Sequence, residues 1–347
     1  MSGFAGRAGA RLTGRRLAVI VIACVIACAL VAVLAPLVGV TSDRGGWHLE
    51  LLGRGVLDPG SLDHALLMVR LPRVLAALVT GAALAGAGCA LQALLRNPLA
   101  EPFTLGISSG ASLGAVLAIR FGVERVLGEG GVGLGALAGA VATLLAIWQL
   151  ARVGRQLPPV TLILAGVAIS MFCSAASVLV QYTSDFSDVE HMLGWMMGGL
   201  DAVPVGWVEL ATPPIVGGLA VLVLYGKEMN ALAAGSEAAA SVGVAVARTQ
   251  VVLFGVSSLL VGSAIAVVGP IGFIGLVVPH ALRSLVGADH RALVVTSAFG
   301  GAIVLAICDT LARTVIPSNH LPTGAVTAVL GVPFFFAILV ANKRGAA

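Results

Sequence analysis

The chain has 347 residues, of which 59% are hydrophobic and only 10% are charged, with a formal net charge of +4. Soluble domains carry about a quarter charged residues. A chain of this length with so few charges cannot cover a folded surface with polar groups in water. The composition therefore excludes an ordinary soluble globular protein and indicates a protein whose solvent is lipid.

Long apolar runs recur along the whole chain, close to the roughly 20 residues that a helix needs to cross a hydrocarbon core about 30 Å thick. They are continuous, unlike the short alternating segments of a membrane barrel. The 45 glycines suit helices that pack closely in lipid. We predict an all-α polytopic membrane protein with about ten helices. They cover residues 17–40, 66–94, 104–120, 132–151, 160–182, 206–226, 248–269, 272–287, 292–312 and 323–341.

The first run has a basic start, like a secretory signal peptide, with four arginines between residues 7 and 16. Cys28 after Val25-Ile26-Ala27 weakly resembles a lipoprotein cleavage site. An apolar stretch of about 24 residues is, however, longer than the core of a signal peptide. We expect residues 17–40 to be the first span, with cleavage or lipidation as the alternative.

Basic residues near helix ends predict the orientation. If the N-terminus lies inside and ten helices alternate, thirteen of the twenty basic residues fall on the inner side, and most loop acids fall outside. We therefore expect a bacterial inner-membrane protein with both termini in the cytoplasm. Residues 1–16 and 342–347 form the tails of a single transmembrane domain at 17–341.

Several kinds of chemistry are missing from the sequence. The five cysteines lie in apolar runs without C-x-x-C spacing, so we expect neither disulfides nor a metal site. Neither Lys227 nor Lys343 ends a phosphate-binding G-x-x-x-x-G-K-[ST] loop. The basic residues of the chain form no patch interleaved with aromatic residues, so no nucleic-acid partner is expected. We expect no catalytic residue and no bound cofactor, and any ATP must be hydrolysed by another polypeptide.

The sequence also contains candidate residues for two rival functions, a hydrolase and an ion-coupled carrier. Gly106-Ile107-Ser108-Ser109-Gly110 matches the G-x-S-x-G elbow of hydrolases, but no strand is predicted before Ser108. An ion-coupled carrier needs ionisable groups within the membrane. The few candidates lie near helix ends, where they can reach water: Glu101, Glu209, His280 and Asp309.

Three segments are unlike generic membrane helix. Arg70-Leu71-Pro72-Arg73 places two arginines near the outer start of the second span, where they can snorkel or offer a planar fork to a carboxylate. Residues 96–111 and 269–280 interrupt apolar runs with glycine and proline, one in each half of the chain. Corresponding interruptions in two halves are typical of an inverted repeat in a transporter.

A fourth segment is the alanine-rich inner loop between Glu228 and Arg248, with glycines at both bends. Its composition predicts two very short helices outside the bilayer, or else a simple surface loop. Such a knob could fit into a cleft on a soluble partner and pass that partner's movement to the membrane helices.

These four segments, in this order, resemble the permease family of iron–siderophore, haem and vitamin B12 ABC importers. The likeness runs from about residue 66 to 340. It includes RLPRVLAALVTGAALAGAG, LQALLRNPLAEPFTLGISSGASLG, LILAGVAIS, GWMMGG, GPIGFIGLVVPHALR, GADHR and LPTGAVTAVLGVPFF. The resemblance implies the type II ABC importer permease fold with inverted-repeat halves.

The resemblance also implies partners: a second permease chain, identical or homologous, two ABC ATPase subunits inside, and a substrate-binding protein outside. It implies that Arg70 and Arg313 meet acids of the binding protein. It implies that the segment at 228–246 fits into the ATPase, whose ATP and Mg²⁺ stay on that subunit. The coupling residues are Asn230, Leu232, Gly235, Glu237, Ala238 and Gly243.

By the same resemblance, the fifth and tenth spans and a short outer helix around 191–199 line the pathway. The lining residues are Met171, Met192, Trp195, Met196 and Leu330. Relatives carry small polar residues in an inner gate before the fifth span, where this chain has Pro159 and Val160, so the gate is not transferred.

The sequence thus predicts a permease that imports an iron–siderophore complex by alternating access, driven by a separate ATPase. Haem or vitamin B12 import by the same mechanism is the first alternative. An ion-coupled secondary transporter is the alternative of another class, and an intramembrane hydrolase built on Ser108 is the third.

Overall fold

The computed structural model of the protein describes residues 14–43, 46–58, 60–154, 156–201, 203–316 and 321–344. Helices stand at all ten predicted positions, which confirms the all-α fold. They are α1 (Gly14–Leu37), α2 (Leu62–Leu94), α3 (Ile107–Arg120), α5 (Gly131–Ala151), α6 (Pro159–Tyr182), α8 (Val205–Leu224), α11 (Val246–Val268), α12 (Ile274–Val286), α13 (His290–Thr314) and α14 (Thr323–Arg344). Most of the predicted N-terminal tail, and residues 345–347 of the C-terminal tail, lie outside the described residues.

Seven of these helices are long and apolar enough to cross a membrane; α3, α12 and the apolar part of α14, Thr323–Ala337, are shorter. Both α3 and α12 begin directly after an interrupted segment, at Gly106 and Phe273, whose φ angles of 82° and 69° are left-handed. A left-handed residue cannot continue a right-handed helix. The interruptions therefore remove the first turns that a full-length span would have.

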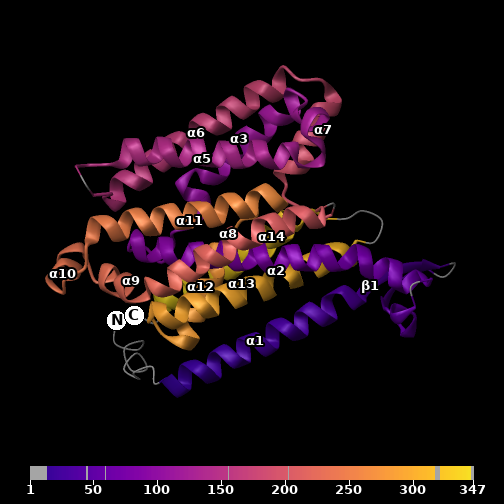
Figure 1. Cartoon of the computed structure of the whole chain (residues 1–347), viewed down its shortest axis with the longest axis horizontal. Coiled ribbons are helices and arrows are strands. Elements are labelled where there is room, and N and C mark those ends of the chain that lie inside the picture. Colours follow the sequence, from indigo (N-terminus) through magenta and orange to yellow (C-terminus); the bar gives the residue numbers. More distant parts are fainter. Residues whose placement is uncertain are drawn as a thin grey trace.

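Figure 1 shows the long helices side by side, with α9 and α10 at one end of the bundle and β1 and α7 at the other. We call these the coupling end and the hairpin end. α1 runs along one edge and α6 along the opposite edge. α1 begins at the coupling end, and the long helices that follow alternate in direction. This arrangement agrees with the predicted alternation of spans.

The central helix is α2, which packs against α13, α11, α12 and α8. At its crossing with α13, a Cβ added to Gly81 would lie 2.3 Å from the Gly301 carbonyl oxygen, and one added to Gly301 would lie 2.2 Å from the Gly81 oxygen. Only glycine permits this backbone approach, which is how helices gain packing contacts in lipid. Gly114 and Gly135 make the same kind of contact between α3 and α5.

The structure differs from the sequence prediction at the hairpin end. The first helix ends at Leu37 rather than at residue 40, and an antiparallel hairpin follows, in which Val38 pairs with Leu51 and Asp43 with Gly46. α2 starts four residues earlier than predicted, at Leu62, so Pro72 lies about three turns into the helix and not near its start. The remaining elements are β1 (Val38–Asp43), β2 (Gly46–Leu51), α4 (Val123–Leu127), α7 (Phe186–Met196), α9 (Gly226–Ala233), α10 (Ser236–Ser241) and the 3₁₀ turns η1 (Arg54–Leu57), η2 (Pro102–Leu105) and η3 (Gly128–Gly130).

Candidate functional site

The two interrupted segments meet inside the bundle. The Glu101 carboxylate accepts a hydrogen bond of 2.5 Å from the backbone N–H of Phe273, which joins the break before α3 to the break before α12. A Cβ on Gly88 of α2 would lie 2.0 Å from the Gly275 oxygen, so α2 also approaches the second break closely. Irregular backbone at membrane depth is tolerated only where protein covers it and satisfies its polar groups. Here Glu101 satisfies the N–H of Phe273.

Burial raises the pKa of the Glu101 carboxyl, and the hydrogen bond from the Phe273 N–H opposes part of that shift. We expect Glu101→Ala to destabilise the protein by about 1–3 kcal/mol, because it leaves the half-buried N–H of Phe273 without its charged acceptor. Glu101→Gln keeps an acceptor oxygen and should be nearly neutral. Thermal unfolding of the purified variants measures both effects.

The difference in stability between the wild type and Glu101→Gln should depend on pH. A carboxyl whose pKa is raised in the folded state stabilises the protein when protonated and loses that contribution as the pH rises through its folded pKa. The wild type should therefore lose stability relative to Glu101→Gln between acidic and neutral pH. A constant difference across this range would show that Glu101 does not titrate in its buried position.

The segment at 228–246 forms the two short helices that its composition predicted. α9 holds Asn230 and Leu232, and α10 holds Glu237 and Ala238. Gly235 between them has a φ of 126°, and Gly243 after α10 has a φ of 84°. Both angles favour glycine, so both bends depend on the residues that were singled out.

Asn230 fastens this segment to the membrane helices. Its side-chain nitrogen donates to the Asp289 carboxylate at 2.8 Å, and its oxygen accepts from the backbone N–H of His290 at 2.8 Å. Hydrogen bonds from the Arg291 guanidinium and from Asn230 hold the pKa of Asp289 well below its ordinary value. Leu232 is fully buried, whereas Glu237 and Ala238 are exposed. α9 is thus anchored to the start of α13, and α10 presents an exposed surface.

At the hairpin end, a buried polar network joins α2, α13 and α14. Asp309 of α13 has no exposed surface, and its carboxylate accepts from Arg73 Nε at 2.7 Å and from the Thr323 hydroxyl at 3.2 Å. Arg313 Nε lies 3.5 Å from the second oxygen of Asp309. Arg73 also forms an ion pair with Asp201, in the segment after α7. Two guanidinium groups and two carboxylates therefore compensate one another at this end.

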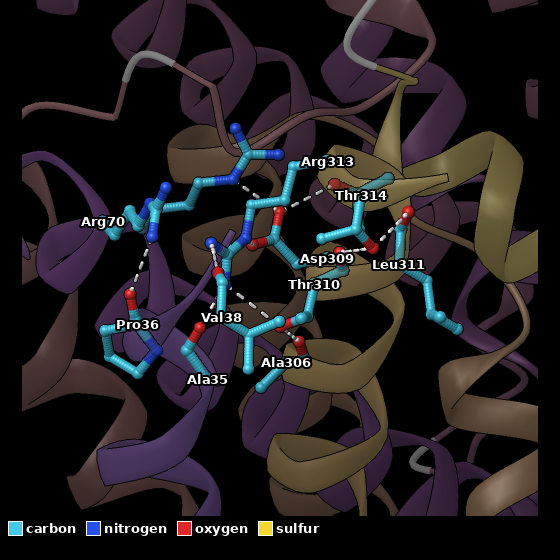
Figure 2. A network of polar contacts seen from close by, with 12 residues as sticks. Ala35, Pro36, Val38, Arg70, Ala306, Asp309, Thr310, Leu311, Arg313 and Thr314 are labelled. Carbon is cyan, nitrogen blue, oxygen red and sulfur yellow. Dashed lines mark hydrogen bonds and ion pairs between the residues drawn. The ribbon is translucent and has the colours of Figure 1, made fainter. Parts of the chain in front are cut away.

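Figure 2 shows how this network holds the end of α1. Arg313 Nη2 donates to the Ala35 carbonyl at 2.5 Å, and Arg313 Nη1 donates to the Val38 carbonyl at 2.8 Å. Arg70 Nη1 donates to the Pro36 carbonyl at 3.4 Å. The last carbonyls of a helix have no partner within the helix. The two arginines supply such partners and so tie α1 to α2 and α13.

The structure changes the expectation for Arg313. The sequence reading placed both docking arginines on an open outer face, but Arg313 is only 8% exposed and its guanidinium is engaged with α1 and Asp309. Arg70 is half-buried and lies at the same end. No local sequence pattern signals this contact, because Ala35 and Val38 precede Arg313 by more than 270 residues.

The predicted pathway residues do not share one environment. Met171 on α6 is 70% exposed and Leu330 on α14 is 49% exposed. Trp195 and Met196, at the end of α7, are half-buried. Met192 is completely buried, because its face of α7 turns toward the core of the same chain. It does not line an open surface here.

The geometry supports neither a hydrolase site at Ser108 nor an ion-coupling site at Asp309 or Glu209. Ser108 is 1% exposed, its hydroxyl has no hydrogen-bond partner among the described residues, and the left-handed Gly106 and a 3₁₀ turn precede it instead of a strand. Asp309 is paired with arginines, and Glu209 is exposed on α8. A nucleophile needs a base within reach, and Ser108 has none within hydrogen-bond distance in the part of the chain that the structure describes.

Comparison with known proteins adds to this geometry. Residues 19–341 match the model of the FecCD transport family. The chain is 39% identical over 302 residues to the uncharacterized ABC transporter permease YvrB of Bacillus subtilis, with 86% of this chain and 85% of YvrB covered. It is 40% identical over 283 residues to the hemin permease HmuU of Yersinia pestis, with coverages of 81% and 84%. It is 40% identical over 278 residues to the vitamin B12 permease BtuC of Salmonella paratyphi A, with coverages of 80% and 83%.

A solved structure gives the same architecture. The chain superposes with a TM-score of 0.79 on a metal-chelate type ABC transporter in an inward-facing conformation. The two sequences are 28% identical, and the alignment covers 93% of this chain and 99% of the solved one.

Proposed function

The chain belongs to the FecCD transport family and is the permease subunit of an ABC importer, without an ATPase site of its own, and from this premise we propose that it imports an iron–siderophore complex. The family match along almost the whole chain carries this proposal. Haem and vitamin B12 are the alternative substrates, because relatives of about equal identity are named for each.

A measurement of the substrate uses the intact transport system. The strain that carries this permease, with the permease deleted, should lose growth on ferric siderophore as its sole iron source and keep growth on haem. The ligand that co-purifies with the cognate binding protein should be a ferric chelate. Loss of growth on haem alone, or a co-purified porphyrin or corrinoid, would overturn the siderophore assignment and leave the family assignment intact.

The proposed orientation puts the coupling end in the cytoplasm of a bacterial cell. Five basic residues lie at that end: Arg96, Arg152, Lys227, Arg248 and Arg291. Cytoplasmic loops carry an excess of basic residues, which supports this direction. α10 would then face the ATPase subunits, and the hairpin end would face the binding protein.

A second permease chain is proposed to complete the pathway. α6 exposes large apolar side chains at helical spacing along one side, among them Val160, Leu164, Val167, Met171 and Tyr182. Residues spaced by three and four lie on one helix face, so this face is continuous. Together with Leu330 of α14, it is the surface that we assign to the partner chain and the substrate, rather than to lipid alone.

The mechanism that we propose is alternating access. Closure of two ATP-bound ATPase subunits moves α10, and the anchoring of α9 to Asp289 and His290 passes this movement to α13. The pathway then exchanges an outward for an inward opening. Its candidate lining is mostly apolar, so it should hold substrate weakly and leave capture to the binding protein.

Docking of the binding protein is assigned first to Arg70. We expect Arg70→Glu to weaken docking by about tenfold at low salt, because charge reversal replaces attraction with repulsion across the interface. The loss should shrink as ionic strength rises and shortens the screening length. Binding of the purified binding protein to the permease–ATPase complex, measured at several salt concentrations, provides the test.

Arg120→Glu is the matched control, because Arg120 ends α3 at the same end of the bundle and is exposed. Both arginines also hold carbonyls at the end of α1, Arg70 that of Pro36 and Arg313 those of Ala35 and Val38, so thermal unfolding of each variant must separate a loss of stability from a loss of docking. Equal docking by the wild type and Arg70→Glu at low salt would remove Arg70 from the interface.

A further inference from the structure

A cavity of about 270 Å³ lies behind α9 at the coupling end, and we call it the α9 cavity. Its lining includes Gln92 and Arg96 from the end of α2, Asn230 from α9, Arg283 from α12 and His290 from α13. No aspartate or glutamate is among its lining residues. The cavity therefore joins four parts of the chain and gathers basic and amide groups without a counter-charge.

Arg283 is the central residue of this cavity. Its Nη2 donates to the side-chain oxygen of Gln92 at 3.0 Å, and its Nε is buried without a hydrogen-bond partner. It forms no ion pair among the described residues. The residue is half-buried, and a guanidinium stays charged in proteins. The site therefore favours a ligand that brings negative charge.

His290 supplies a second unmatched group. The residue is only 4% exposed, and its Nδ1 lies 2.8 Å from the oxygen of Asn230, which fixes the ring. Because the Asn230 oxygen accepts, His290 Nδ1–H is the donor, and Nε2 is a buried hydrogen-bond acceptor without a partner in the described structure. The neighbouring Asp289 does not supply a negative charge to the cavity, because its carboxylate is held by Arg291 at 2.6 Å and by Asn230 at 2.8 Å.

Arg96 lies where the α9 cavity opens to solvent. It is exposed at the mouth of the cavity, and its Nη2 donates to the Ser236 hydroxyl of α10 at 3.3 Å. A second guanidinium thus stands between the cavity and the coupling segment. Phosphate oxygens match the forked donors of arginine, and a cavity of this size suits a single tetrahedral group better than a nucleotide.

We propose that the α9 cavity binds a phosphate-type oxyanion, whose charged oxygens accept from Arg283 and Arg96 and whose P–O–H group donates to His290 Nε2. Bound there, the anion bridges α2, α12 and α13 behind Asn230 and stiffens the attachment of α9. The shared chemistry fits two sources, inorganic phosphate in solution and the headgroup of a phosphomonoester lipid. This assignment concerns the single chain and does not depend on the substrate that the transporter carries.

The test uses the purified, delipidated full-length permease in nonionic detergent. Inorganic phosphate is titrated against chloride at constant ionic strength and pH, with binding of radiolabelled phosphate by equilibrium dialysis as the readout. We expect saturable binding, and a half-saturating concentration that rises at least about tenfold in Arg283→Gln and in Arg96→Gln, the effect of losing one charge-assisted contact. Arg96 is exposed, so its variant keeps the test valid if Arg283→Gln fails to fold.

Arg248→Gln is the matched control, because Arg248 lies at the same end but outside the α9 cavity. Its phosphate binding should match that of the wild type. A parallel titration with dioctanoyl phosphatidic acid, against uncharged dioctanoylglycerol, separates the two sources. Binding of only the lipid, with the same dependence on Arg283 and Arg96, would support the oxyanion site and assign it to a headgroup.

Two results would overturn the proposal. One is the absence of saturable binding of both phosphate and phosphatidic acid, which would leave a cavity filled by water alone. The other is equal binding by the wild type, Arg96→Gln and a folded Arg283→Gln, which would place any bound anion elsewhere. Neither result depends on ATP, the binding protein or transport, so the proposed function is tested separately.

Discussion

Replacement of residues 229–243 by a glycine–serine linker of the same length should abolish substrate uptake by the assembled transporter while the ATPase subunits still hydrolyse ATP. α9 is anchored to α13 through Asn230, Asp289 and His290, and α10 follows it through the tight bend at Gly235. A flexible chain behaves as a random coil and transmits no directed displacement. Uptake and ATP hydrolysis measured in the same proteoliposomes separate these activities.

The matched control replaces residues 123–127, the short helix α4 at the hairpin end, by a linker of the same composition. This variant should keep uptake within about twofold of the wild type, since α4 has no buried residue. If the 229–243 variant retained hydrolysis that is stimulated by the loaded binding protein and coupled to uptake, the contact with the ATPase would lie elsewhere.

Asp309→Ala should destabilise the permease by about 3–5 kcal/mol, the cost of leaving a buried charge without its partner. Among the described residues, Asp309 is the one carboxylate that forms ion pairs with both Arg73 and Arg313, and both arginines are less than 10% exposed. Thermal and denaturant unfolding of the purified protein measure the effect.

Two further variants isolate the electrostatic cause. Asp201→Asn removes a carboxylate whose side chain is 42% exposed, so its loss should cost much less. Asp309→Ala combined with Arg73→Met should recover part of the stability, because both members of one buried pair are then gone. Equal losses for Asp201→Asn and Asp309→Ala would show that the network is solvated and not a buried structural element.

The sequence predicted the helices well because helices in lipid are continuous apolar runs, seven of them long enough to cross a hydrocarbon core. All ten positions were found, and the glycine bends of α9 and α10 were found because Gly235 and Gly243 stand where a left-handed residue is needed. The hairpin at 38–51 was missed, since its strands are short and Val38-Gly39-Val40 continues the apolar run of α1. Local pattern cannot separate a helix end from a strand start there.

The polar contacts were beyond sequence reasoning for a different reason. Glu101 and Phe273 are 172 residues apart, and Arg73 and Asp309 are 236 residues apart. Charge and position along the chain identified Asp309 as a candidate ion site, but only the fold shows that two arginines neutralise it. Met192 was assigned to the pathway from its place in the short outer helix around 191–199, and that place does not say which face of α7 it occupies.

We propose that this chain is a passive conduit whose energy arrives from a partner at its coupling end. The most direct measurement is uptake of radiolabelled ferric chelate into proteoliposomes that contain the permease alone, or the permease with its ATPase and binding protein. We predict concentrative uptake only in the complete system, with ATP present and with the proton gradient collapsed. Concentrative uptake by the permease alone, driven by an ion gradient, would contradict the account.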